Sequence, residues 1–160
     1  MVEAKRSISL GFTDQRVLEG QHICYIYNDD QERLEVMAKY LSSGYQAREK
    51  LLYLVDAMTQ AEMLVQLSER GVDFKDAKPK DFTLADADSA YCPSGFFKTE
   101  EMLELVKSFY LDALQEGYAG ARGTGEMGWC QVEGRANRLD LFSYEAKLND
   151  LLHEYPYTAC

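Results

Sequence analysis

Short apolar runs alternate with longer amphipathic stretches over most of this sequence. An apolar and aromatic run at 22–27 precedes a helical pattern that ends at Gly44, and a second run at 51–55 precedes one that ends at Gly71. Strands buried on both faces lack polar residues, whereas the helices that cover them repeat apolar residues every three to four positions. This alternation predicts a mostly parallel sheet with right-handed crossovers and helices on both faces.

The later elements follow the same order. We expect a strand at 82–85, a polar loop at 86–97, a helix from Thr99, a strand within 121–129, a helix at 134–154 and the start of a strand at 157–160. The predicted fold class is therefore α/β, with three layers (α-β-α) around a mostly parallel sheet of about five strands. Residues 1–20, interrupted by Gly11 and Gly20, are interpreted as an N-terminal arm. Residues 21–160 are interpreted as one domain whose last strand the chain does not complete.

Capping residues mark where two of the helices begin. Thr59 with Glu62, and Asn28 with Gln31, have the three-residue spacing of a capping box. In this motif the first side chain bonds the backbone of the third helical residue, whose own side chain reaches back. Both pairs therefore predict a helix start directly after a strand.

The stretch 121–129, A-R-G-T-G-E-M-G-W, contains a literal G-x-G-x-x-G. A dinucleotide site needs a strand before the first glycine and a helix opening at the last, but here the glycines fall inside the predicted strand. Alternation puts Arg122 and Glu126 on one face, with the glycines, Met127 and Trp129 on the other. Because Arg122 and Glu126 are about 13 Å apart along a strand, each needs its own partner.

Charge and composition exclude several classes of function. The net charge of -10 argues against nucleic-acid binding, which requires a clustered positive surface. No apolar run approaches the roughly 20 residues of a membrane span, and the N-terminus lacks a signal-peptide core, so we expect a cytoplasmic protein without a membrane partner. The cysteines show no C-x-x-C pairing and are interpreted as free thiols: Cys24, Cys92, Cys130 and Cys160.

The motifs of common enzymes are missing. No G-x-S-x-G is present, and N-D-D-Q-E-R-L-E follows the first predicted strand where a phosphate-binding loop would need G-x-x-x-x-G-K-[ST]. Cys92 is the one cysteine in a predicted loop that suits a nucleophile, with only two histidines available as bases. His22 and Cys24 share one face of their predicted strand, so a metal is an alternative to a histidine bonded to backbone. We therefore expect a protein that is not an enzyme and carries no cofactor.

In sheets of this kind, ligands bind beyond the carboxyl ends of the strands. That rule selects Tyr27, Asp56, the loop 86–97 and the stretch 126–129. Aromatic residues there include Tyr91 and Trp129. They are equally consistent with the wall of an apolar pocket and with ordinary packing beneath a loop.

The sequence resembles the MEDS domain, the methanogen/methylotroph DcmR sensory domain. The resemblance rests on H-I-C-Y-I-Y at 22–27, G-Y-Q-A-R-E-K-L-L-Y at 44–53, Y-C-P-S-G-F at 91–96, R-G-T-G-E-M-G-W at 122–129, Y-E-A-K-L-N at 144–149 and Cys160. The family pattern falls on His22, Tyr27, Gly44, Glu49, Tyr53, Tyr91, Arg122, Gly125, Glu126, Met127, Trp129, Glu145, Asn149 and Cys160.

The resemblance implies a RecA- or KaiC-like core without a working phosphate-binding loop. It also implies a prokaryotic sensory domain that binds small hydrocarbon derivatives, such as methylated or halogenated one-carbon compounds, and acts with a histidine kinase or a DNA-binding output module. We expect the ligand to contact His22, Tyr27, Tyr91, Arg122, Glu126, Trp129 and Glu145. The sequence leaves open a metal- or thiol-dependent protein that uses His22 and cysteines, a degenerate RecA-like assembly module, and association between copies of the chain.

Overall fold

The computed structural model describes all residues except 1–4, 73, 75–77 and 79. Within the described residues, four parallel strands form the main sheet in the order β4-β3-β5-β6. The strands are β3 (Glu49–Val55), β4 (Phe82–Asp86), β5 (Gly120–Gly125) and β6 (Thr158–Ala159). The predicted α/β class is confirmed, although the sheet has four strands where about five were expected.

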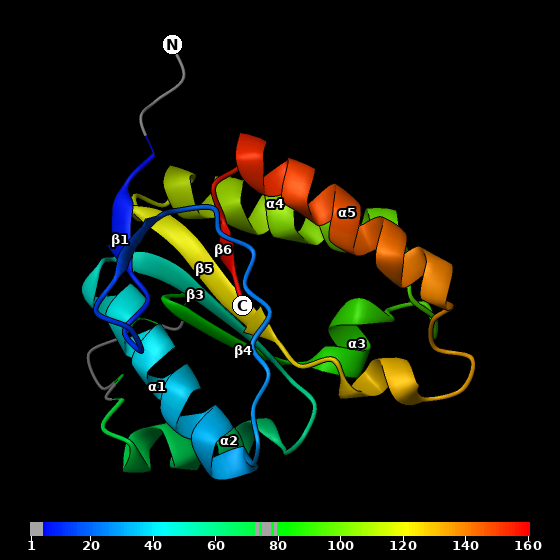
Figure 1. The fold of residues 1–160 in the computed structure, drawn as a ribbon, viewed down its shortest axis with the longest axis horizontal. Helices are drawn as coiled ribbons and strands as arrows, with labels where there is room; N and C mark the ends of the chain where they lie inside the picture. The colour runs from blue at the N-terminus through cyan, green and yellow to red at the C-terminus, as the bar shows by residue number, and fades with distance from the viewer. Residues whose placement is uncertain (1–4, 73, 75–77, 79) are drawn as a thin grey trace.

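Helices cover both faces of this sheet (Figure 1). On one face lie α1 (Asp30–Gln46) and α2 (Gln60–Glu69), and on the other lie α4 (Thr99–Gln115) and α5 (Arg138–Glu154). The central strand β3 is buried at all seven positions and divides the core by alternation. Leu52 and Leu54 pack with α4 and α5, whereas Leu51, Tyr53 and Val55 pack with α1 and α2. The result is the three-layer arrangement that the sequence predicts.

The predicted strand at 22–27 is wrong. Only His22 forms a bridge, to Ala159, and the chain then runs as an extended loop in which Cys24 and Tyr27 are exposed. We call residues 21–28 the strap, because they run from the N-terminal arm past β6 to the start of α1 (Figure 1). An apolar run without polar alternation is found both in a buried strand and in a loop that covers a cavity. The sequence pattern alone does not distinguish these two structures.

Two other boundaries differ from the prediction at helix and strand ends. Asp29, not Asn28, caps α1 by accepting a hydrogen bond from the backbone of Glu32, while the capping box of Thr59 and Glu62 at α2 is confirmed. Strand β5 stops at Gly125, and Trp129 lies in a short 3-10 helix, η1 (Gly128–Gln131). Met127 and Trp129 therefore do not continue the glycine face of the strand.

Segments expected to be irregular are partly ordered. The loop after β4 contains a short helix, α3 (Ala87–Tyr91), capped by Asp86. The N-terminal arm contains an antiparallel pair of strands, β1 (Ser7–Ser9) and β2 (Arg16–Leu18). Ile8 and Leu10 of this arm are buried against the core that contains α1. Within the described residues, no helix is long and apolar enough to cross a membrane.

Candidate functional site

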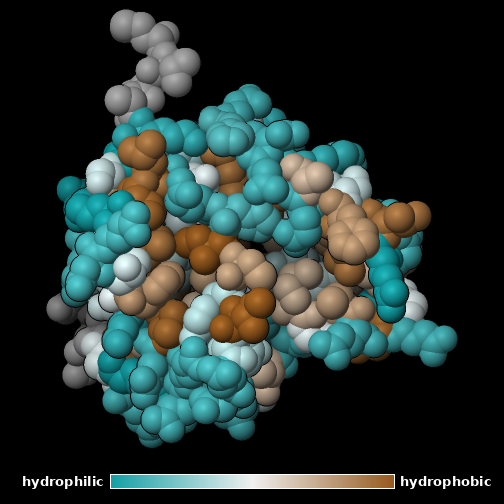
Figure 2. Space-filling model, in the orientation of Figure 1, coloured by the Kyte–Doolittle hydropathy of each residue, from teal (hydrophilic) through white to brown (hydrophobic). Residues whose placement is uncertain are grey.

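A cavity of about 500 Å³ lies at the carboxyl ends of β3, β5 and β6. Its walls come from the strap, α1, α3, α4, α5 and the loop after β5. Figure 2 shows apolar side chains gathered around a hollow in the middle of this face, with polar residues around them. The volume falls within the range of roughly 300–1,000 Å³ that is common for small-molecule sites.

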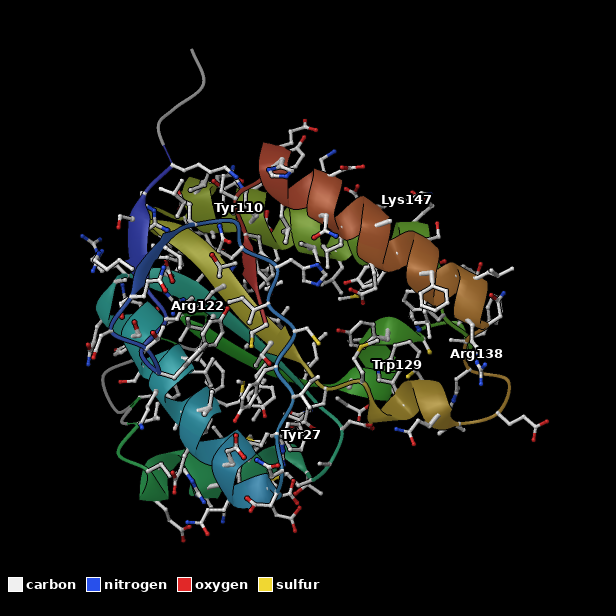
Figure 3. All side chains as sticks on the ribbon, in the orientation of Figure 1. Tyr27, Tyr110, Arg122, Trp129, Arg138 and Lys147 are labelled. Carbon is white, nitrogen blue, oxygen red and sulfur yellow. The ribbon has the colours of Figure 1, made fainter. Side chains whose placement is uncertain are left out.

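Five of the seven predicted contact residues line the cavity and two do not. Those that line it are His22, Tyr27, Tyr91, Glu126 and Glu145. The two others, Arg122 and Trp129, have exposed fractions of 0% and 1% and belong to the core. Figure 3 shows Arg122 between the sheet and α1, and Trp129 beside α3.

Arg122 forms a buried ion pair with Glu49 of the neighbouring strand. Its two terminal nitrogens donate to the backbone carbonyls of Tyr40 and Ser9, both at 3.0 Å. Each of the three guanidinium nitrogens is therefore bonded within the layer between sheet and α1, and Arg122 does not line the cavity. The expectation that Arg122 contacts a ligand is not supported by its position, although the expectation that it has its own partner is confirmed.

Glu126 joins the ends of β3 and β5. Its Oε2 accepts hydrogen bonds from the backbone amides of Asp56 and Ala57, each at 2.7 Å. Its Oε1 accepts from the hydroxyl of Tyr53 at 2.7 Å and forms an ion pair with Arg33. Because both oxygens are occupied in this way, the carboxylate fixes the loop geometry at the floor of the cavity.

Arg33, which the sequence does not single out as a site residue, lines the same cavity and is 2% exposed. Its Nε lies 3.1 Å from Asp30 Oδ1, its Nη1 lies 3.1 Å from the Tyr53 hydroxyl, and its Nη2 is enclosed without a hydrogen-bond partner among the described residues. The guanidinium also lies 5.8 Å from the ring centroid of Tyr27, a cation–π contact. A signal was available: Arg33 stands four residues before Met37, on the side of α1 that the apolar stripe predicts to be buried.

His22 attaches the strap to α5. Its Nδ1 lies 3.0 Å from Asn149 Oδ1, and its Nε2 lies 3.3 Å from Glu145 Oε2. The amide of Asn149 donates to the carbonyl of Glu145, which orients its oxygen toward the histidine. A second contact holds the strap to β6: the backbone N–H of Ile23 donates to the carbonyl of Ala159 at 2.8 Å.

Tyr91 and Tyr144 line the cavity, and other aromatic rings pack behind them. Tyr91 stacks on Trp129 with 4.7 Å between ring centroids, and Phe97 lies edge-on to Tyr144 at 5.4 Å. Burial raises the pKa of Tyr91 well above its ordinary value. Trp129 thus supports the cavity wall from behind, and its indole Nε1 has no hydrogen-bond partner among the described residues.

Three of the four cysteines line the cavity: Cys24, Cys130 and Cys160. Burial raises the pKa of the Cys160 thiol to about 11, and it also raises the pKa of Cys92, a core residue at the end of α3. A raised pKa reduces the thiolate fraction and with it the reactivity of a cysteine. In the part of the chain that the structure describes, no group of three or more His, Cys, Asp or Glu side chains is placed to hold a metal ion.

The described residues thus form a three-layer α/β domain with a largely apolar cavity at the carboxyl ends of its parallel strands, the place where open α/β sheets commonly bind ligands. Residues 21–160 match the model of one family, the MEDS domain, described as the methanogen/methylotroph, DcmR sensory domain. The chain belongs to this family, and the resemblance read from the sequence is confirmed. It is a sensory domain of a signalling system. A comparison with curated proteins found no match.

Proposed function

We propose that this chain is a cytoplasmic, non-enzymatic ligand-binding domain of prokaryotic signal transduction, with a RecA-type core that lacks a phosphate-binding loop. The cavity of about 500 Å³ at the carboxyl ends of the strands carries this proposal. Its ligand is a small hydrocarbon derivative, and its output is a histidine kinase or a DNA-binding module.

The state of the polar groups favours binding over catalysis. Glu126, a carboxylate at the floor of the cavity, is held by four hydrogen-bond or ionic partners. The pKa of Cys92 is raised by burial, opposite to the change that activates a nucleophile. Neither group supplies a free base or thiolate.

The strap supplies a route from binding to signalling. A ligand transmits a signal only if it binds one conformation more tightly than another. The strap is held to α5 through His22 and to β6 through a backbone bond, and it lines the cavity along its length. Occupancy of the cavity would therefore change how firmly the strap and α5 hold together.

A thermal-shift screen tests the proposal. The probes are small methylated and chlorinated compounds, larger hydrocarbon derivatives, phosphates and divalent metals, and we expect at least one hydrocarbon derivative to raise the unfolding midpoint. Leu148→Phe fills the cavity from α5 and should abolish that shift. Leu151→Phe is the matched control, because Leu151 lies on the same helix, packs against the core and does not line the cavity.

Met102→Phe, which fills the cavity from α4, repeats the test if Leu148→Phe unfolds. Stabilisation by no compound, or equal stabilisation of the filled and control variants, would contradict the proposal. The metals in the screen also test the alternative of a metal-dependent protein that uses His22 and cysteines.

A second candidate, association of copies, is favoured by exposed apolar side chains near the start of α5. Leu139 and Phe142 are 78% and 70% exposed and one turn apart, and Val132 precedes them at 55%. Light scattering over a hundredfold concentration range, without ligand, separates an assembly module from a monomeric sensor.

A further inference from the structure

Three tyrosines whose hydroxyls have no hydrogen-bond partner among the described residues line the cavity. Tyr91 comes from α3, Tyr144 from α5 and Tyr157 from the residue before β6, and all three line the cavity. Their exposed fractions are 6%, 4% and 4%. Buried polar groups are almost always hydrogen-bonded, so three unsatisfied hydroxyls at one place indicate something that the cavity is built to receive.

The hydroxyl oxygens retain access to the open space of the cavity. The fully enclosed side-chain atoms that lack a partner in the described residues belong to Arg33, Arg70 and Trp129, and the three phenolic oxygens are not among them. By contrast, Tyr40 and Tyr53, on the other face of the sheet, donate to neighbouring groups. The unsatisfied hydroxyls are therefore a property of this side of the cavity.

Two glycines of β5 make room for these hydroxyls. A Cβ at Gly123 would lie 1.7 Å from the Tyr157 oxygen, and a Cβ at Gly125 would lie 2.2 Å from the Tyr91 oxygen. No side chain larger than hydrogen fits at either position while the tyrosines stay in place. The glycine-rich strand thus brings two phenols close to the backbone, which accounts for the G-x-G that first suggested a phosphate site.

The surroundings select against a charged ligand. Burial raises the pKa of all three tyrosines, and the nearby carboxylate of Glu145 adds to the effect at Tyr91 and Tyr144. The phenols therefore stay protonated and donate hydrogen bonds, while the same carboxylate disfavours an anion beside them. Arg33, a cation that also lines the cavity, is paired with Glu126. Apolar side chains of α4 and α5 also line the cavity, among them Met102, Val106 and Leu148.

We infer that the cavity binds a neutral, mostly apolar organic molecule through a hydrogen-bond-accepting oxygen, such as a carbonyl, held by the hydroxyls of Tyr91, Tyr144 and Tyr157. This inference rests on the proposed function and names the ligand class. A carbonyl oxygen has two lone pairs, so it accepts from two of the three phenols at once. A halogenated one-carbon compound offers no such acceptor and fills only a small part of about 500 Å³.

Three probes of nearly the same shape separate the chemistries. Acetophenone carries a carbonyl, ethylbenzene replaces it with a methylene group, and benzoate replaces it with a carboxylate. By isothermal titration at neutral pH, acetophenone should bind about tenfold or more tightly than ethylbenzene, because each neutral hydrogen bond accounts for up to roughly tenfold in affinity. Benzoate should bind more weakly than acetophenone because of Glu145.

Conservative variants connect the effect to the hydroxyls. Tyr91→Phe, Tyr144→Phe and Tyr157→Phe each remove one oxygen. At least two of these variants should bind acetophenone severalfold more weakly than the wild type, while their affinity for ethylbenzene stays the same. Without ligand, their unfolding midpoints should stay at the wild-type value, because no hydrogen bond within the protein is lost. Tyr40→Phe is the control with the opposite pattern: it removes a 2.9 Å bond to the carbonyl of Thr158 and should lower the midpoint.

The outcomes separate this inference from the function on which it rests. Binding of ethylbenzene as tight as that of acetophenone, or unchanged acetophenone binding in all three variants, would overturn the inference and leave a ligand-binding cavity. Loss of stability without ligand in the three variants, as large as in Tyr40→Phe, would also overturn it, because the hydroxyls would then be bonded within the protein or to trapped water. If no compound binds, neither these three probes nor any compound of the wider screen, both the inference and the proposed function are overturned.

Discussion

The two charged side chains of the β5 region have different roles despite their similar setting. Arg122 is paired with Glu49 inside the layer between sheet and α1, and Glu126 is bonded to the loop after β3 at the floor of the cavity. Removing one partner of a buried ion pair leaves the other charge buried and uncompensated, which costs more than the pair itself contributes. The structure therefore makes Arg122 a stability residue.

Replacing Arg122 by methionine should lower the free energy of unfolding by about 3 kcal/mol, measured in urea. The value lies at the low end for buried pairs because Glu49 keeps a second partner, Arg6, at 2.8 Å. Lys147→Met breaks an exposed pair with Glu100 and should cost less than about 1 kcal/mol. Equal losses of unfolding free energy in the two variants would show that Arg122 does not form a buried ion pair with Glu49.

At the scale of elements, α1 lies so close to β5 that Gly44 is buried between them. A Cβ there would lie 2.6 Å from Cδ and Nε of Arg122 and 2.7 Å from Cδ2 of Leu51. Arg122 cannot move aside, because its ion pair with Glu49 and two carbonyl bonds fix it. Gly44, predicted to end the helix, instead lies inside it and permits the contact.

Gly44→Ala should therefore destabilise the protein by roughly 1–3 kcal/mol through overpacking. In an open helix the same change would stabilise by about 1 kcal/mol, so the sign is diagnostic. Ser42→Ala, two residues earlier in α1, serves as the control and should be close to neutral. Urea unfolding of both variants measures the two changes in stability. A gain in stability for Gly44→Ala would mean that α1 and β5 lie farther apart than in this structure.

At the scale of the whole molecule, the N-terminal arm is part of the folded unit although the family match begins at residue 21. Ile8 and Leu10 are buried at 3% and 6% exposure, and the Ser9 carbonyl accepts from Arg122. Arg6 bonds both Glu19 of the arm and Glu49 of β3. The arm thus closes the side of the core that α1 leaves open.

Ile8→Ala should lower the free energy of unfolding by about 2–5 kcal/mol, as for other buried isoleucines. Urea unfolding measures this as a lower midpoint. Ile26→Ala is its control, because Ile26 lies in the strap at 85% exposure and should change stability by less than about 0.5 kcal/mol. Similar effects of the two substitutions would show that the arm does not contribute to the core.

The sequence by itself determined the layers, because strand and helix periodicities are local and several helices carry their own capping residues. It placed β3, α2, α4 and α5 close to their observed bounds, and it identified the family that the comparison confirms. It also selected the right end of the sheet for the site, because parallel strands end at a common edge.

Only the tertiary structure decided which side chains face the cavity. Periodicity misassigned the strap as a strand, since an apolar run that covers a cavity and one buried in a sheet have the same composition. It could not separate Arg122 from Glu126, because the end of β5 at Gly125 depends on bonds to the loop after β3. Nor could it place Tyr91, Tyr144 and Tyr157 in one cavity, since residues far apart in sequence come together only when helices pack on the sheet.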